Sequence, residues 1–304
     1  MKKITAIFIA CLSVLTTLCG EALPLADPFI LLEGDTYYAY GTSSDDGIAV
    51  FTSKDLKTWQ SAGLALHKQD VWGEKFFWAP EVYKVDDGFL MYYSAEEHIC
   101  CAKADSPLGP FKQTQEKTMF PSGCSIDHTL FIDSDGTPYI YFTRFIQGNS
   151  IWTAQLEKDL VTIKADTLKM CFAASQKWEL VQARVNEGSA VLKHDGKYFL
   201  TYSGNDYQSR FYGIGYATAD SPSGPWVKNE TNPIYQCTGD LVGVGHHAFF
   251  HDKEGVLRVV FHAHNGRDRI HPRLMHISSA SFRDGKLYIS PDYFTPQLVK
   301  TDSR

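Results

Sequence analysis

A turn-and-strand phrase that recurs five times constrains the fold of this chain more than any other feature of its sequence. Each copy has an acidic residue and a glycine in a turn, followed by an aromatic-rich strand pattern. The copies are EGDTYYAYGT from Glu33, DDGFLMYYSA from Asp86, SDGTPYIYFT from Ser134, HDGKYFLTYS from His194 and KEGVLRVVFHA from Lys253. Periods of about 50 residues are typical of repeat architectures in which each unit is one small sheet.

The segments around each copy give the repeat the size of a propeller blade. An apolar strand pattern precedes each phrase, and a third strand follows in the first four units, twice with the nearly identical turns SPLGP and SPSGP. Three clear strands and an expected fourth match a four-stranded blade, and radial repetition of blades protects the sheet edges. The sequence therefore predicts an all-β fold, a five-bladed β-propeller with four-stranded blades.

The first strand of every predicted blade begins with a polar residue at a matching place. These residues are Asp27, Glu81, Asp127, Glu187 and His246. Because the first strands line the axis of a closed ring, we expect the five side chains to converge on one central cavity. Acidic residues also favour turns that begin strands, where they cap free N–H groups. Five polar residues at matching positions favour a shared site over five separate caps.

Convergent carboxyl groups suit the hydrolysis of glycosidic bonds. One carboxylic acid with a raised pKa protonates the leaving oxygen, while a second, ionised carboxylate activates a water molecule. A third carboxylate nearby raises the pKa of the acid by like-charge repulsion. The sequence offers enough acids at the predicted axis for all three roles.

The chain resembles the family-43 glycoside hydrolases of the five-bladed-propeller class, over essentially all of its length after residue 20. The resemblance is carried by one segment per blade: ADPFI, WAPEV, SIDHTLFIDSDGTPYIYF, NEGSAVLKHDGKYFLTYSGN and GVGHHAFF. It implies that Asp27 is the general base that activates water and that Glu187 is the general acid. It implies that Asp127 is the carboxylate that orients Glu187 and tunes its pKa.

The resemblance also implies which residues surround the substrate. Trp78 would line the sugar subsite and Arg273 would bind sugar hydroxyls. Glu81 and His128 are expected in the same substrate-binding group. His246 would help to hold a calcium ion in the central channel, largely through water, and no organic cofactor is expected.

Two positions depart from the family pattern. Ser189 stands two residues after Glu187, where a proline is usual, and we expect this change to affect the strand entry and not the chemistry. His128 stands where a proline or a small residue is common, and it could alter the cavity wall or the proton balance there.

The N-terminal segment MKKITAIFIACLSVLTTLCG, residues 1–20, predicts a secretory signal peptide, because two lysines precede an apolar run that ends in small or polar residues. Cys19 is a candidate for lipid attachment, but Leu18 is larger than lipoprotein processing usually accepts, so an anchor is not favoured. Residues 21–304 then form one catalytic domain, expected in the periplasm or outside the cell. No later stretch approaches the roughly 20 apolar residues of a spanning helix.

Charge and residue spacing narrow the range of partners. The net charge is −6 and no lysine or arginine stripe is present, so we expect no nucleic-acid partner. Several histidines lie between His246 and His276, but their spacing offers no clear third ligand, which disfavours a zinc site. The sequence shows no helix with an exposed apolar face and no long unpaired edge strand, so we expect a monomer.

These observations predict an exported, inverting hydrolase that removes terminal pentose residues, first of all α-L-arabinofuranosyl residues, from plant-type oligo- or polysaccharides. A β-xylosidase and an exo-acting galactosidase are the alternatives on the same scaffold, and exo versus endo action stays open. A carbohydrate-binding propeller without catalysis would have a broken triad, whereas Asp27, Asp127 and Glu187 are all present. Retaining fructan-cleaving propellers share the topology, but their Asn-Asp-Pro and Arg-Asp-Pro motifs are missing here.

Overall fold

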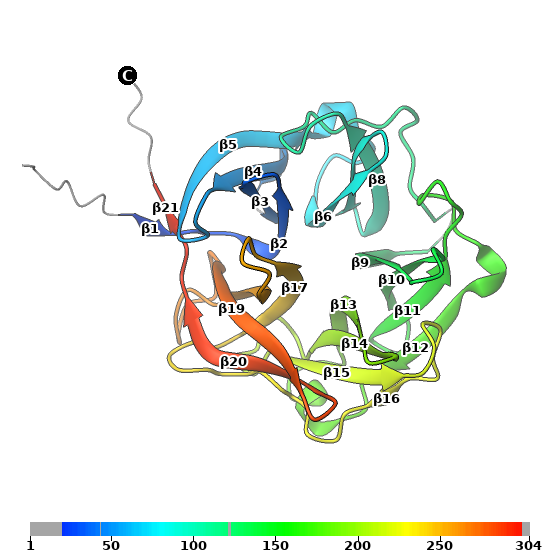
Figure 1. Ribbon diagram of the computed structural model, residues 1–304, viewed down its shortest axis with the longest axis vertical. Coiled ribbons are helices and arrows are strands. Elements are labelled where there is room, and N and C mark those ends of the chain that lie inside the picture. The colour runs from blue at the N-terminus through cyan, green and yellow to red at the C-terminus, as the bar shows by residue number, and fades with distance from the viewer. Residues whose placement is uncertain (1–19, 43, 121–122, 300–304) are drawn as a thin grey trace, which may run out of the picture.

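Five sheets stand around a central axis like the blades of a propeller (Figure 1). The structure, a computed structural model, describes residues 20–42, 44–120 and 123–299. The predicted all-β five-bladed propeller is confirmed. The predicted signal peptide, including Cys19, lies outside the described residues apart from Gly20, so the leader and the lipid anchor stay predictions.

Successive strands of each blade run from the axis to the rim (Figure 1). The first blade contains β2 (Ala26–Glu33), β3 (Thr36–Thr42), β4 (Gly47–Ser53) and β5 (Thr58–His67). The third contains β9 (Ser125–Ile132), β10 (Pro138–Phe145), β11 (Asn149–Gln155) and β12 (Lys169–Ala173). The fourth contains β13 (Asn186–His194), β14 (Lys197–Gly204), β15 (Gly213–Ala219) and β16 (Val227–Lys228). The fifth contains β17 (Gly245–His251), β18 (Leu257–Ala263), β19 (Leu274–Arg283) and β20 (Lys286–Phe294).

The second blade differs from the predicted four strands. Among the described residues its sheet has three strands, β6 (Trp78–Val85), β7 (Gly88–Ala95) and β8 (His98–Ala104). Isolated bridges join Cys100 to Thr118 and Lys103 to Lys112, where the outer strand would lie. Short 3-10 helices occur in connecting segments: η1 (Lys68–Asp70), η2 (Ala165–Thr167) and η3 (Lys177–Leu180).

The ring is closed by two short strands that the sequence did not reveal. β21 (Gln297–Leu298) pairs in parallel with β5, and β1 (Glu21–Ala22) pairs antiparallel with β21. The sheet of the first blade therefore has six strands, and segments from the start and the end of the described chain lie side by side at its outer edge (Figure 1).

The repeated phrases form the hairpins between the first and second strands, as predicted. In the first blade Glu33 pairs with Thr36 across a two-residue turn in which Gly34 has a φ of 60°. Glycine adopts this left-handed conformation without the strain that a Cβ atom would cause.

The two similar proline turns fasten neighbouring blades to each other. The hydroxyl of Tyr40, in the first blade, donates to the carbonyl of Pro107 in SPLGP at 2.5 Å. The hydroxyl of Tyr141, in the third blade, donates to the carbonyl of Pro222 in SPSGP at 2.5 Å. Each turn therefore accepts a hydrogen bond from a tyrosine of the preceding blade.

The hydrophobic core is distributed between adjacent blades. In one cluster, Tyr40 and Val50 of the first blade pack with Val82 and Met91 of the second. All four side chains are fully buried. Because each cluster needs both neighbours, the blades depend on one another for burial.

A β-bulge interrupts the head of every first strand. In each bulge one residue has a positive φ: Asp27 (49°), Ala79 (45°), Asp127 (53°), Gly188 (54°) and His246 (45°). We call these five the bulge residues. Bulges redirect side chains and are frequent beside active sites, and here they turn the backbone at the axis.

Side chains of the neighbouring blade hold four of the bulge residues by their backbone N–H groups. The four bonds are Ala79 to Thr42 Oγ1 (3.0 Å), Asp127 to Ser94 Oγ (3.4 Å), His246 to Ser203 Oγ (2.7 Å) and Asp27 to His262 Nδ1 (3.2 Å). These bonds satisfy buried donors and join consecutive blades at the level of the axis.

Candidate active site

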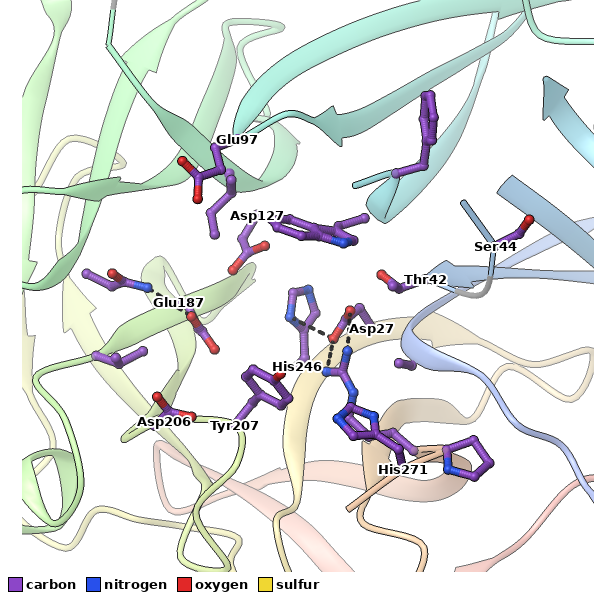
Figure 2. A pocket seen from close by; sticks show the side chains of 18 of the residues that line it. Asp27, Thr42, Ser44, Glu97, Asp127, Glu187, Asp206, Tyr207, His246 and His271 are labelled. Carbon is purple, nitrogen blue, oxygen red and sulfur yellow. Dashed lines mark hydrogen bonds and ion pairs between the residues drawn. The ribbon is translucent and has the colours of Figure 1, made fainter. Parts of the chain in front are cut away.

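A cavity of about 730 Å³ lies at the axis, and residues from all five blades line it (Figure 2). Six of the eight predicted site residues face this cavity: Asp27, Trp78, Asp127, Glu187, His246 and Arg273. The convergence predicted from the strand heads is therefore present for Asp27, Asp127, Glu187 and His246, whereas Trp78 and Arg273 were expected from the resemblance.

Asp27 is held as an ionised carboxylate. The Arg273 guanidinium donates to its two carboxylate oxygens at 2.7 and 3.1 Å, and Nδ1 of His246 lies 3.3 Å from Oδ1 (Figure 2). Burial alone would raise the pKa of Asp27, but Arg273, with smaller contributions from His246 and His262, holds it well below its usual value. Asp27 can therefore accept a proton across the whole neutral range.

Glu187 lies on the opposite side of the cavity in a different environment (Figure 2). The hydroxyl of Tyr212 donates to its Oε1 at 2.8 Å, and Nδ2 of Asn149 donates to its Oε2 at 3.1 Å. Burial raises the pKa of Glu187 to about 7, although both hydrogen bonds oppose the shift. No cation pairs with this carboxyl among the described residues. Glu187 can therefore carry a proton near neutrality, as a general acid must.

Asp127 is a further buried carboxyl on the wall of the cavity. Burial, followed by the Glu187 and Asp27 carboxyls, raises the pKa of Asp127 well above its usual value. Two neighbouring buried carboxyls resist ionising together, because each negative charge raises the pKa of the other group. The role of Asp127 in tuning Glu187, which the resemblance implies, stays a prediction.

Trp78 forms one wall of the cavity. Its ring stacks on the ring of Phe76, with centroids 4.9 Å apart and planes at 28°. Lys75 Nζ lies 4.8 Å from the Phe76 centroid on this stack. An indole supported from behind in this way offers a flat apolar surface to a sugar ring.

The structure does not bring Glu81 to the cavity. The bulge in β6 places Ala79, and not Glu81, at the position equivalent to Asp27. Glu81 lies two residues further along, where it accepts a hydrogen bond from the Tyr83 hydroxyl. Burial raises the pKa of Glu81 to about 8, with hydrogen bonds from Tyr83 and Thr129 in opposition. Glu81 is therefore not among the residues that line the cavity, and its predicted contact with substrate has no support from this placement.

His128 is also buried away from the cavity lining. It follows the bulge residue Asp127, is 2% exposed and packs against the Tyr92 ring at 5.4 Å. Burial lowers the pKa of His128 to about 3, so its ring is neutral. The predicted contact of His128 with substrate has no support from this placement, because the residue next to the bulge turns into the protein interior.

Comparison with known proteins identifies the family. A sequence model described as "Glycosyl hydrolases family 43" matches residues 22–287. The chain belongs to glycosyl hydrolase family 43. As a member of this family it is a glycoside hydrolase, and the predicted resemblance is confirmed.

Two solved structures are similar to this family-43 chain over nearly its full length. A crystal structure described as an endo-1,4-beta-xylanase from Bacteroides thetaiotaomicron VPI-5482 is 46% identical, with a TM-score of 0.89, and the match covers 93% of this chain and 100% of that one. A structure described as a thermostable family-43 glycoside hydrolase is 36% identical, with a TM-score of 0.84 and coverage of 95% and 99%.

Curated relatives of this family-43 chain carry several activities. An Aspergillus niger protein named beta-D-galactofuranosidase xynD is 26% identical over 263 residues, which are 78% of this chain and 73% of that protein. A Streptomyces avermitilis protein named extracellular exo-alpha-(1->5)-L-arabinofuranosidase is 26% identical over 273 residues, which are 80% of this chain and 55% of that protein. The chain thus spans little more than half of the Streptomyces protein.

Several residues of the family-43 site carried no repeat signal in the sequence. They are the Glu187 partners Asn149 and Tyr212 and the cavity residues Glu97, Asp206 and Tyr207. Three of these, Asp206, Tyr207 and Tyr212, belong to one loop between β14 and β15. Figure 2 shows Glu97 on the Asp127 side of the cavity and Asp206 with Tyr207 on the Glu187 side. Loop residues have no fixed place in a strand repeat, so only the folded chain reveals them.

A buried ion pair supports the strand that carries Glu187. Lys228 donates to Glu179 at 2.6 Å and to the side-chain oxygen of Asn186, the residue before Glu187, at 2.9 Å. The Lys228 and Glu179 side chains are 10% and 0% exposed, and the Tyr202 hydroxyl also donates to Glu179 at 2.6 Å. The network therefore anchors the entry of β13 beneath the site.

Lys228→Met is expected to lower the free energy of unfolding by about 3 kcal/mol, because it leaves the buried Glu179 carboxylate without its cation. Chemical denaturation monitored by tryptophan fluorescence measures the change. The matched control is Lys54→Met, which removes the exposed ion pair with Asp35 and should leave the stability nearly unchanged. Equal stability of the two variants would contradict the role of the buried pair.

The side chains at the axis offer few oxygen ligands for the direct coordination of a calcium ion. Within residues 20–42, 44–120 and 123–299, no group of three or more histidine, cysteine, aspartate or glutamate residues is arranged to hold a metal ion. Calcium takes six to eight oxygen ligands, whereas His246 offers a ring nitrogen whose neighbour, Nδ1, faces Asp27. The residues thus fit only an ion held through water.

Within residues 20–42, 44–120 and 123–299, no helix is long and apolar enough to cross a membrane.

Proposed function

We propose that this enzyme removes terminal α-L-arabinofuranosyl residues from plant-type glycans by hydrolysis with inversion. The observation that carries the chemistry is the contrast between two carboxyls of one cavity. Arg273 keeps the pKa of Asp27 low, while burial keeps that of Glu187 raised. Environments that push two pKa values apart assign the base and the acid.

The reaction follows from these protonation states. A water molecule bonds through its oxygen to the anomeric carbon and gives a proton to Asp27, as Glu187 gives its proton to the departing glycosidic oxygen. Tyr212 and Asn149 hold the Glu187 carboxyl in place during this transfer. Asp127, whose own pKa burial and the Glu187 carboxyl raise, is proposed to orient the acid and to tune its pKa.

The substrate assignment is supported by the size and lining of the cavity and by the relatives. A cavity of about 730 Å³ with one aromatic wall is large enough for a few neutral sugar residues. The Streptomyces relative is named for arabinofuranosidase activity. The second candidate is a xylan-derived substrate, because the 46% identical Bacteroides structure is described as a xylanase.

We also propose export to the periplasm or the cell exterior, action as a monomer, and a calcium ion held through water near His246. Export is supported by the lysine-led apolar N-terminus and by relatives named as extracellular. Processing is tested by mass spectrometry of the protein purified from a bacterial periplasm. Calcium is tested by isothermal titration with CaCl₂ of wild type and His246→Ala.

The deciding experiment is hydrolysis of a panel of aryl glycosides: α-L-arabinofuranoside, β-D-xyloside and β-D-galactoside. Asp27→Ala on the same panel controls for contaminating activity. Turnover of the arabinofuranoside alone, with a product of inverted anomeric configuration by proton NMR, is the expected result. Preference for the xyloside would select the second candidate. No turnover, together with retained sugar binding, would indicate a propeller that only binds carbohydrate.

A further inference from the structure

The loop between β14 and β15, residues 205–212, contacts Arg273, the partner of Asp27, and also contacts Glu187. Tyr207 lines the cavity, and the guanidinium carbon of Arg273 lies over its ring at 4.7 Å from the centroid. This is the same guanidinium that makes the two-point ion pair with Asp27. Figure 2 shows Tyr207 and Asp27 on adjoining sides of the cavity.

Arg273 has few other fixed contacts. Its Nε is buried and has no hydrogen-bond partner among the described residues. Apart from Asp27, its hydrogen-bond partner among the described residues is Nε2 of His262, at 3.4 Å from Nη1. The Tyr207 ring therefore offers a surface that can keep the guanidinium in the plane needed for its bonds to Asp27.

The loop itself is firmly fixed. Asn205 is fully buried with a φ of 71°, and its side chain accepts the N–H of Gln182 at 2.8 Å and donates to Ser209 Oγ at 2.8 Å. The carbonyl of Tyr207 accepts a hydrogen bond from His264 Nε2 at 2.8 Å. A loop tied at these points can hold an aromatic ring in one orientation.

The far end of the same loop reaches the acid. Tyr212 is fully buried and donates to Glu187 at 2.8 Å. Its ring also stacks on His262, at 5.8 Å and 12°, and the His262 ring in turn accepts the backbone N–H of Asp27. One short segment thus sets the position of Glu187 relative to Asp27.

We infer that Tyr207 is a positioning residue for hydrolysis: its ring holds the Arg273 guanidinium in register with Asp27, and its loop ties this arrangement to Glu187. The inference rests on the proposed roles of Asp27 and Glu187. Tyr207 acts through Arg273, so its loss should slow the chemical step and leave the binding of substrate nearly unchanged.

Tyr207→Leu is expected to lower kcat about tenfold with little change in KM, since it removes a partly buried cation–π contact. Tyr207→Phe keeps the ring and should restore nearly the wild-type kcat. Tyr288→Leu is the matched control, because Arg283 stacks on Tyr288 at 5.7 Å in the fifth blade, outside the cavity lining. Its kcat should equal that of wild type. Thermal melts of all variants exclude loss of the fold as the cause.

A double-mutant cycle tests whether Tyr207 acts through Arg273. In an Arg273→Gln background, Tyr207→Leu should cause little further loss of kcat. A full tenfold loss in both backgrounds would overturn the inference, as would a raised KM with unchanged kcat, which marks a direct substrate contact. A wild type that hydrolyses no glycoside would refute the proposed function and the positioning role together. A cycle on unfolding free energy would then report the Tyr207–Arg273 contact alone.

Discussion

Asp27→Asn is expected to lower kcat by about 10³- to 10⁴-fold on every substrate, whatever its leaving group. The amide cannot take the proton of the attacking water, and the buried Arg273 charge loses its partner. Asparagine is a fair replacement because it tolerates the left-handed φ of 49° at this bulge. Steady-state kinetics on an activated aryl glycoside and on a natural oligosaccharide measure the loss.

The matched control for this substitution is Asp252→Asn. Asp252 is also a buried aspartate paired with an arginine, Arg258, at 2.7 Å, but it lies outside the cavity lining. Asp252→Asn is expected to lower stability and to retain wild-type kcat in the folded protein. An Asp27→Asn variant with more than a tenth of the wild-type kcat would rule out Asp27 as the base.

Glu187→Gln is expected to lower kcat by about 10³-fold on substrates with poor leaving groups and only slightly on activated aryl glycosides. The reason is that a poor leaving oxygen must be protonated as its bond breaks, whereas a good one departs as an anion. Kinetics across a series of leaving groups of increasing pKa measure this dependence. A loss of the same size along the whole series would contradict a role in leaving-group protonation.

The same residue sets the expected pH dependence. Since burial raises the pKa of Glu187 to about 7, the proton needed for catalysis is present below that pH and is lost above it. The kcat/KM of wild type should therefore fall as the pH rises through about 7. Glu187→Gln should lack this alkaline limb, because glutamine does not titrate. A limb of unchanged position in the variant would assign it to another group.

The fold was predictable because the hairpin phrase that marks each blade recurs at regular intervals along the sequence. Five copies of one hairpin phrase leave few alternatives to a ring of blades, and the structure has that ring. Closure was not predictable, because β1 and β21 are two residues each and carry no pattern. The short second blade was missed for a similar reason, since isolated bridges around Thr118 and Lys112 replace a regular strand.

The site was partly predictable, and its errors have a geometric cause. Asp27, Asp127 and Glu187 reach the cavity as their strand heads suggested. Glu81 does not, because it lies after the bulge in β6, whereas the cavity residues lie at the bulge or just before it, a difference of about two residues that the sequence pattern does not resolve. Ala79 holds that place in the second blade.

Each bulge provides two positions from which a side chain can reach the axis: the bulge residue itself, which we call the bulge tier, and the residue just before it. The catalytic carboxyls are divided between these two positions. Asp27 and Asp127 occupy the bulge tier, whereas Glu187 and Trp78 occupy the position just before it, opposite Ser203 and Ser94 of the adjoining strands. The proposed acid, Glu187, thus differs from the proposed base, Asp27, in its position relative to the bulge as well as in its hydrogen-bond partners. The second blade shows the consequence: its bulge residue is Ala79, which brings no carboxyl to the axis, and the residue before it, Trp78, supplies an aromatic wall.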